Sequence, residues 1–245
     1  MNDHPTPSHG PPRPHALTIS QPDLVVHSGI PALDALLGGF RASAITLVDG
    51  NSSLITDLPN QLCVQTYQTF HSPSLYIDGG MAANPYRIAH HARALHLDAH
   101  DVLASVSIAR AFTLYQLASL IHDALEPTIQ QQQPRTVIIG RFPSLYLDPD
   151  VPTDEAVTLL ATTLETLRRL TTQYRLITVL TSKDRTLLPS QRGLRDTLYG
   201  TADEVIRLKE LDDCLLLDSL THGTTATLVL AGRGQRRLDA FTPGG

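Results

Sequence analysis

Short aliphatic runs alternate with longer segments of helical period from about residue 24 onward. A parallel strand that is buried on both faces has a nearly continuous aliphatic sequence, whereas an amphipathic helix repeats its apolar residues every three or four positions. The alternation therefore predicts an α/β fold: a mostly parallel central sheet flanked by helices, with antiparallel strands at the C-terminal edge. The predicted strands are 43–48, 74–78, 104–109, 135–139, 175–181, 204–209, 214–219 and 225–231.

The clearest predicted helix spans residues 154–172, and Thr153 is its expected N-terminal cap. Its apolar stripe packs on the sheet and consists of Val157, Leu160, Leu164, Leu167 and Thr171. The segment 126–134 contains a run of glutamines bounded by prolines, which predicts a surface loop.

Residues 1–22 are rich in proline and histidine and poor in aliphatic residues, so they cannot bury enough apolar surface to become ordered. We therefore expect a disordered tail at 1–22 and a single core domain at 23–245, a division that agrees with the length of 245 residues. Histidines at positions 4, 9, 15 and 27 have irregular spacing, which does not predict a metal site.

The net charge of −5 argues against a globally basic nucleic-acid binder, although a local arginine patch could still bind DNA. Cys63 and Cys214 lie in apolar runs without metal-ligand spacing, which predicts buried, reduced thiols. No apolar run approaches the twenty or so residues of a membrane span, and the first residues do not resemble a signal peptide. The sequence thus predicts a soluble intracellular protein of the cytoplasm, nucleoid or nucleus, without a membrane partner.

Five segments resemble the core of the RecA/RadA recombinase superfamily, which includes recombinase paralogues and KaiC-like relatives. The segments are HSGIPALDALLGGF at 27–40, SAITLVDG at 43–50, SLYIDGG at 74–80, NPYRIAHHARALHLD at 84–98 and VSIARAF at 106–112. Their combination is distinctive, although each alone is weak. The resemblance implies a RecA-like P-loop NTPase fold for residues 23–245.

In that superfamily the first core strand leads into a glycine-rich loop that binds ATP phosphates through backbone N–H groups, a lysine and a magnesium-binding Ser/Thr. Aligned on this motif, Ile55 occupies the lysine position and Leu54 the preceding glycine position, while Thr56 retains the hydroxyl. The first lysine of the chain is Lys183, so no other register restores the motif. The degenerate loop positions are Gly50, Ser52, Ser53, Leu54, Ile55 and Thr56.

The resemblance also implies a catalytic glutamate two residues after Asp78, where this chain has Gly80, and a metal-binding aspartate where it has Gly140. Losing two charge-assisted phosphate contacts of roughly 1.5–3 kcal/mol each weakens binding by roughly two to four decades. We therefore expect a pseudo-ATPase with no catalytic residue, no metal and weak or absent ATP binding. Arg87 aligns with an arginine that stacks on adenine in relatives, but a solvent-facing helical arginine is the preferred explanation.

The resemblance implies two DNA-facing loops. The first, 143–153, is acidic and has no arginine, which does not favour phosphate binding. The second, 182–195, contains four cations that could hold single-stranded DNA without reading bases, and an ordinary solvated loop is the alternative. A further basic cluster at 233–237 could extend a DNA path or protect a strand edge. The DNA-binding candidates are Lys183, Arg185, Arg192, Arg195, Arg233, Arg236 and Arg237.

Superfamily members often assemble through a Phe-x-x-Ala peptide ahead of the core, and residues 1–40 contain no such tetrapeptide. The expected function is a catalytically inactive paralogue that serves as an accessory or scaffold in DNA recombination and repair, with an active RecA/RadA-type recombinase as partner. One alternative is a KaiC-like regulatory module that binds protein and not DNA. Another is an active ATPase with an unorthodox site.

Overall fold

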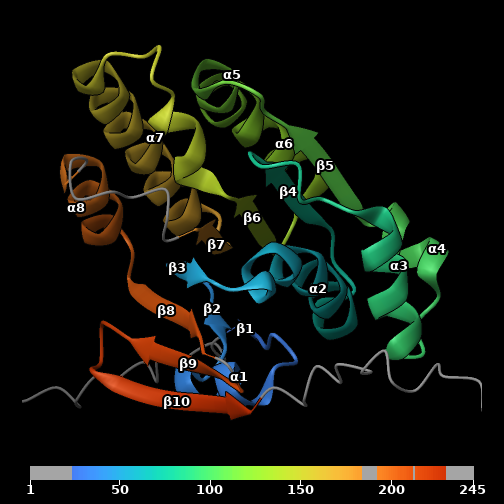
Figure 1. The fold of residues 1–245 in the computed structure, drawn as a ribbon. Coiled ribbons are helices and arrows are strands. Elements are labelled where there is room, and N and C mark those ends of the chain that lie inside the picture. Colours follow the sequence, from blue (N-terminus) through green and yellow to red (C-terminus); the bar gives the residue numbers. More distant parts are fainter. Residues whose placement is uncertain (1–23, 184–191, 212, 230–245) are drawn as a thin grey trace, which may run out of the picture.

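The computed structural model describes residues 24–183, 192–211 and 213–229. An eight-stranded sheet crosses this part of the chain, and helices cover both faces of the sheet (Figure 1). A separate two-stranded sheet consists of β1 (Val25–Val26) and β2 (Phe40–Arg41). The large sheet consists of β3 (Ala44–Asn51), β4 (Ser74–Asp78), β5 (Val106–Arg110), β6 (Thr136–Gly140), β7 (Ile177–Ser182), β8 (Glu204–Glu210), β9 (Cys214–Ser219) and β10 (Thr224–Val229).

The strands of the large sheet lie in the order β10-β9-β8-β3-β7-β6-β4-β5. The six strands from β8 to β5 run parallel to one another, and β9 and β10 add antiparallel strands at the C-terminal edge. The predicted α/β fold is therefore confirmed. Each predicted strand overlaps an observed one.

Helices connect the parallel strands. They are α2 (Ser53–Phe70), α3 (Pro85–Ala94), α4 (Ala99–Ala104), α5 (Leu114–Ser119), α6 (Leu125–Gln132), α7 (Thr153–Gln173) and α8 (Arg192–Thr201). A further helix, α1 (Pro31–Leu37), lies between the antiparallel strands β1 and β2. A π-helical turn, Leu120–Ala124, joins α5 to α6, and a 3-10 helix, Phe142–Leu147, follows β6.

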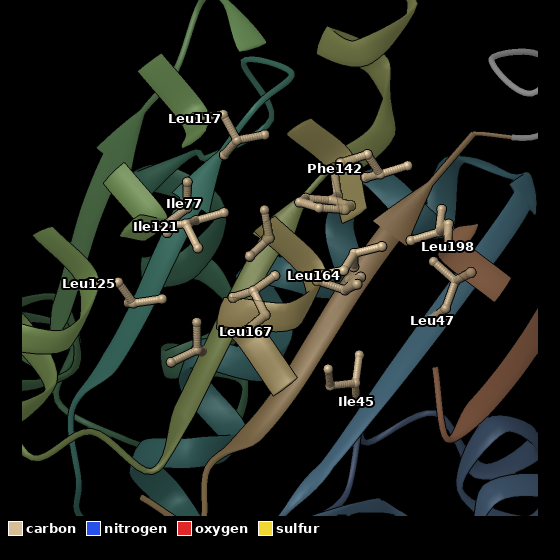
Figure 2. Packing of buried hydrophobic residues seen from close by; sticks show 14 of the residues in the cluster. Ile45, Leu47, Ile77, Leu117, Ile121, Leu125, Phe142, Leu164, Leu167 and Leu198 are labelled. Atoms are coloured by element: carbon tan, nitrogen blue, oxygen red, sulfur yellow. The ribbon is translucent and has the colours of Figure 1, made fainter. Parts of the chain in front are cut away.

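Alternate residues of the central strands face opposite helical layers. Ile45 and Leu47 of β3 belong to the apolar cluster that also includes residues of α5, α6, α7 and α8, and Figure 2 shows Leu47 beside Leu198. Val48 faces the other layer, with α1 and α2. Because successive strand residues point to opposite faces and both faces are buried, the central strands have continuous aliphatic sequences.

The predicted stripe on the long helix packs on the sheet. Leu160, Leu164 and Leu167 of α7 are buried in the core, and Thr171 hydrogen-bonds Thr178 of β7 with 2.6 Å between the hydroxyl oxygens. Val157 is only partly buried at the edge of this cluster. This stripe holds α7 against β3, β6 and β7, as helical periodicity predicts.

Two local predictions are wrong. Residues 126–134 are largely helical, since α6 runs from Leu125 to Gln132. Pro127 has no backbone N–H to donate, and the π-helical turn Leu120–Ala124 that directly precedes α6 is the local irregularity that accompanies it. Ile129 of α6 is buried. Thr153 does not cap α7 but begins it, after Pro152, and no side chain caps this helix.

The predicted tail at 1–22 lies outside the described residues. Within the described part of the chain, no helix combines the length and the apolar character needed to cross a membrane.

We predict that Leu164→Ala lowers the free energy of unfolding by about 2–5 kcal/mol, because it leaves a cavity between α7 and the sheet. Urea unfolding of both proteins measures this difference. Glu165→Ala changes the exposed neighbour on the same helix and should alter stability by about 0.5 kcal/mol or less. Equal effects of the two substitutions would contradict the packing described for α7.

Candidate functional site

The carboxyl ends of the parallel strands meet at one edge of the sheet, which is where open α/β sheets bind ligands. β3, β4, β6 and β7 end there at Asn51, Asp78, Gly140 and Ser182. The strand ends that the RecA resemblance assigns to nucleotide binding therefore lie at one edge of the protein.

The connection from β3 to α2 is a single residue. β3 continues to Asn51 because Gly50 and Asn51 pair with Leu208 and Lys209 of β8. Ser52 then caps α2, with its side chain accepting a hydrogen bond from the N–H of Leu54 at 3.2 Å. A phosphate-binding loop needs several successive residues whose N–H groups point inward, and this junction has no such stretch.

Gly50 is required by the close approach of β8. Its φ is +140°, and a Cβ atom at this position would clash with the backbone carbonyl of Leu208. The next positions of the expected loop, Ser53 to Thr56, belong to the first turn of α2. Ile55, at the lysine position of the resemblance, is fully buried in the apolar layer around α1 and α2. Packing against that layer accounts for its apolar side chain.

An acidic side chain lies at the N-terminus of α2. The N–H of Ser53 donates to Oε2 of Glu210 at 3.4 Å, and Glu210 is the last residue of β8. The N-terminus of a helix attracts anions through its unsatisfied N–H groups and its dipole. Here the carboxylate of the protein itself takes one of those N–H groups, and its negative charge repels a phosphate.

Asp78 holds the loop that follows β4. Its buried carboxylate accepts hydrogen bonds from the N–H groups of Gly80, Ala82 and Ala83 at 3.1, 3.0 and 2.8 Å. Nε of Arg110 lies 3.7 Å from the same carboxylate. These contacts satisfy the buried charge, so Asp78 stabilises residues 79–84.

The side chain of Arg141 covers Gly80. A Cβ atom at position 80 would clash with Arg141, whose backbone N–H donates to Oγ1 of Thr181 at 2.9 Å. Arg141 has a positive φ of 53° and directly follows β6. A glutamate in place of Gly80 would have to displace this arginine.

The ring of Tyr76 lies over Gly140, the last residue of β6. A Cβ atom at position 140 would lie 2.9 Å from both the ring and the hydroxyl of Tyr76. Tyr76 is fully buried, and this burial raises the pKa of its hydroxyl. An aspartate at position 140 would need this ring to move.

Tyr199 of α8 closes the end of β3, a contact that the sequence analysis missed. Its hydroxyl donates to Oδ2 of Asp49 and accepts from Nη2 of Arg207 at 3.0 Å. Burial, followed by the charge of Asp49, raises the pKa of Tyr199 to about 12. The guanidinium of Arg195 lies 5.1 Å from the centre of the Tyr199 ring. An arginine and a tyrosine four residues apart on a helix lie on one face, and this pair was the only sign of Tyr199's contacts in the sequence.

Arg87 joins α3 to α2. Its Nε donates to Oδ1 of Asp57 at 3.0 Å, its Nη2 contacts Oδ2, and Nε2 of His91 lies 3.0 Å from Oδ2. The Arg87 side chain is still 50% exposed. Burial opposes the ionisation of Asp57, but Arg87 and His91 outweigh it and lower the pKa of the carboxyl.

The predicted DNA-binding cations lie in different settings. Lys183 directly follows β7, Arg192 begins α8, and Arg195 is exposed one helical turn later. The second predicted loop is therefore helical from Arg192 onward. The remaining candidates, Arg185, Arg233, Arg236 and Arg237, lie outside the described residues. Among the residues that the structure does describe, no three His, Cys, Asp or Glu side chains gather closely enough to hold a metal ion.

A small apolar cavity lies beside the edge strand β5, and the sequence analysis missed it. It measures about 110 Å³ and lies between strands β4 and β5 and the helical segment 120–128. Within the described sheet, β5 pairs only with β4, so its outer side is an edge. The small residues Ser107 and Ala109, at alternate positions of β5, line the cavity and were its only sequence signal. The other lining residues are Leu75, Tyr76, Ile77, Ile108, Leu120, Ala124, Leu125 and Thr128.

We predict that Asp57→Asn lowers stability at neutral pH, and that this loss shrinks below about pH 4. A carboxyl whose pKa is lowered by folding stabilises the protein above its unfolded-state value of 3.8, and this contribution is lost as pH falls through the folded-state pKa. Urea unfolding between about pH 7 and pH 3 measures the difference. The exposed Glu165→Gln substitution is the control, and a pH-independent loss in Asp57→Asn would contradict the ion pair.

A comparison with protein families matches residues 21–190 to the Rad51 family. The matched span covers more than half of the chain and includes β1 to β7 with their connecting helices. A search of curated proteins finds no match. Given the RecA-like order of strands and this match, the chain belongs to the Rad51 family of the RecA/RadA recombinase superfamily, whose members act in DNA recombination and repair.

Proposed function

We propose that this chain is an accessory subunit of recombination and repair that does not hydrolyse ATP and that docks through its core on an active recombinase. The observation that carries the proposal is the single-residue junction at Ser52, which leaves no loop to wrap a triphosphate. Phosphoryl transfer depends almost wholly on positioning and on charge stabilisation of the phosphates. A chain without that loop can act in recombination only by binding.

Three further contacts support the loss of hydrolysis. The Glu210 carboxylate lies at the N-terminus of α2, Arg141 covers Gly80, and the ring of Tyr76 lies over Gly140. In the order given, these side chains lie where the resemblance expects the phosphates, the catalytic glutamate and the metal-binding aspartate. Restoring any one residue would therefore leave two obstacles in place.

The cavity beside β5 supports the docking step. An extended peptide that adds to a sheet edge gains main-chain hydrogen bonds, and its alternate side chains enter pockets on one face. Aliphatic cavities of about 150 Å³ accept a benzene ring, so 110 Å³ is close to the room that a phenylalanine side chain needs. A Phe-x-x-Ala segment of the partner, which family members use for assembly, fits this chemistry.

DNA contact is the second part of the proposal. Rad51-family proteins bind DNA and other recombinases, and the exposed Arg195 on α8 could hold backbone phosphates. A KaiC-like module that binds protein alone would share the docking step and lack this contact.

We predict that the purified full chain hydrolyses ATP no faster than a buffer control, with or without single-stranded DNA, because the phosphates lack a binding loop. Release of inorganic phosphate in the presence of magnesium measures turnover. The Thr56→Ala variant identifies contaminating activity, since a contaminant is unaffected by it. Turnover that Thr56→Ala abolishes in an otherwise folded protein would instead support an active ATPase with an unorthodox site.

We predict that a synthetic peptide containing Phe-x-x-Ala binds the chain, and that Ala124→Leu weakens this binding about tenfold or more, equivalent to about 1.4 kcal/mol. Ala124 is exposed and lines the cavity, so a larger side chain blocks it at little cost in folding. Fluorescence anisotropy of the labelled peptide measures the affinity.

The neighbouring Asp123→Asn substitution is the matched control, because Asp123 is exposed and does not line the cavity. A peptide with glutamate in place of phenylalanine should not bind. Equal affinity of the parent and Ala124→Leu proteins would remove the cavity from the docking proposal.

A further inference from the structure

Two aromatic side chains next to β5 face solvent. Phe112 is 61% exposed and Tyr115 is 52% exposed, whereas most large apolar side chains of the described core are buried. Exposed aromatic rings that lie together frequently mark a binding surface, because covering them releases water from a large apolar area. These two residues are unused by the site at the carboxyl edge.

Hydrogen bonds hold the backbone of Phe112 and the side chain of Tyr115. The N–H of Phe112 donates to Oε1 of Gln116 at 2.8 Å, and the N–H of Gln116 donates to Oγ1 of Thr113 at the start of α5. The Tyr115 hydroxyl donates to Oε1 of Glu155 at 2.7 Å and so connects α5 to α7. The two helices lie side by side at the top of Figure 1. A surface fixed in this way loses little conformational entropy on binding.

Hollows flank Tyr115 on both sides, and together they form what we name the α5–α7 groove. The first is lined by Phe112, Tyr115, Leu120 and the cation Arg110 among others, and the second by Tyr115, Glu155 and Leu159 among others. Nε of Arg110 lies 3.7 Å from the Asp78 carboxylate, so this cation already has an acidic neighbour. Their volumes are about 500 and 550 Å³. Leu120 also lines the cavity beside β5, so the groove and that cavity are neighbours.

The α7 side of the groove is acidic. Asp154 and Glu155 line the second hollow, and Asp148 and Asp150 precede them in the chain. Within the described ranges, no ion pair neutralises any of these four carboxylates. The hydrogen bond to Glu155, then partial burial, then the charges of Glu155 and Asp148 raise the pKa of Tyr115. The groove therefore presents negative charge next to exposed aromatic rings.

We propose that the α5–α7 groove binds a basic, arginine-containing stretch of the partner, adjacent in sequence to the segment that enters the β5 cavity. Guanidinium groups pair with carboxylates and stack on tyrosine rings, so one such side chain can satisfy both features of the groove. This inference rests on the proposed docking function and adds the chemistry of the flanking partner residues.

The test uses the full chain and four labelled peptides. One carries only the Phe-x-x-Ala anchor, two extend it with three arginines at its N- or C-terminal side, and one has a serine extension of the same length. At least one arginine peptide should bind about tenfold more tightly than the anchor at low salt, and this gain should shrink as salt is added. The serine peptide should bind like the anchor.

The double variant Asp154→Asn, Glu155→Gln should abolish the gain and leave the affinity for the anchor peptide unchanged. Glu165→Gln changes an exposed acid of α7 that lines neither hollow, and it is the matched control. Circular dichroism of the three proteins verifies that they fold alike.

The other outcomes show whether cavity docking, the groove proposal or both have failed. If the anchor binds and neither arginine extension adds affinity, or if the gain survives the double variant, the groove proposal is overturned and cavity docking stands. If the anchor fails but an arginine peptide binds in a manner that needs Asp154 and Glu155, cavity docking is overturned and the groove stands. If no peptide binds, both are overturned.

Discussion

The pairing of β3 with β8 determines the shape of the carboxyl edge. β3 and β8 remain paired as far as Gly50 and Asn51 of β3, and at Gly50 the two backbones come so close that only glycine fits. Because main-chain pairing uses these residues, the chain turns into α2 after a single capping serine. A loop that could wrap phosphates would require β3 to separate from β8 several residues earlier.

The rest of that edge is filled by the protein's own side chains. Asp78 stabilises the loop after β4, and the hydroxyl of Tyr199 joins α8 to the end of β3 through Asp49. Buried polar groups usually find partners, and the Asp78 carboxylate and the Tyr199 hydroxyl find theirs within the chain. The edge is thus filled by side chains of the chain itself, although the buried Tyr76 hydroxyl, Arg141 Nε and Ser182 Oγ have no hydrogen-bond partner among the described residues.

The surface near β5 has the opposite character. Small residues on the edge strand create a cavity, and exposed Phe112 and Tyr115 extend an apolar path toward the acidic start of α7. Apolar surface facing water is unfavourable unless a partner covers it. The contrast between a filled ligand edge and an open strand edge is the basis of the proposed docking function.

Local patterns in the sequence determined the order of strands and helices, the buried stripe of α7 and the absence of a phosphate-binding lysine before Lys183. These features depend on neighbouring residues or on composition, so they can be read without a structure. The tertiary structure decided the length of β3, the arginine over Gly80, the bond from Tyr199 to Asp49 and the cavity beside Ala109. Each of these depends on contacts between elements that are distant in the chain, because the sheet order places β8 beside β3 and leaves β5 at an edge, and no local periodicity encodes that order.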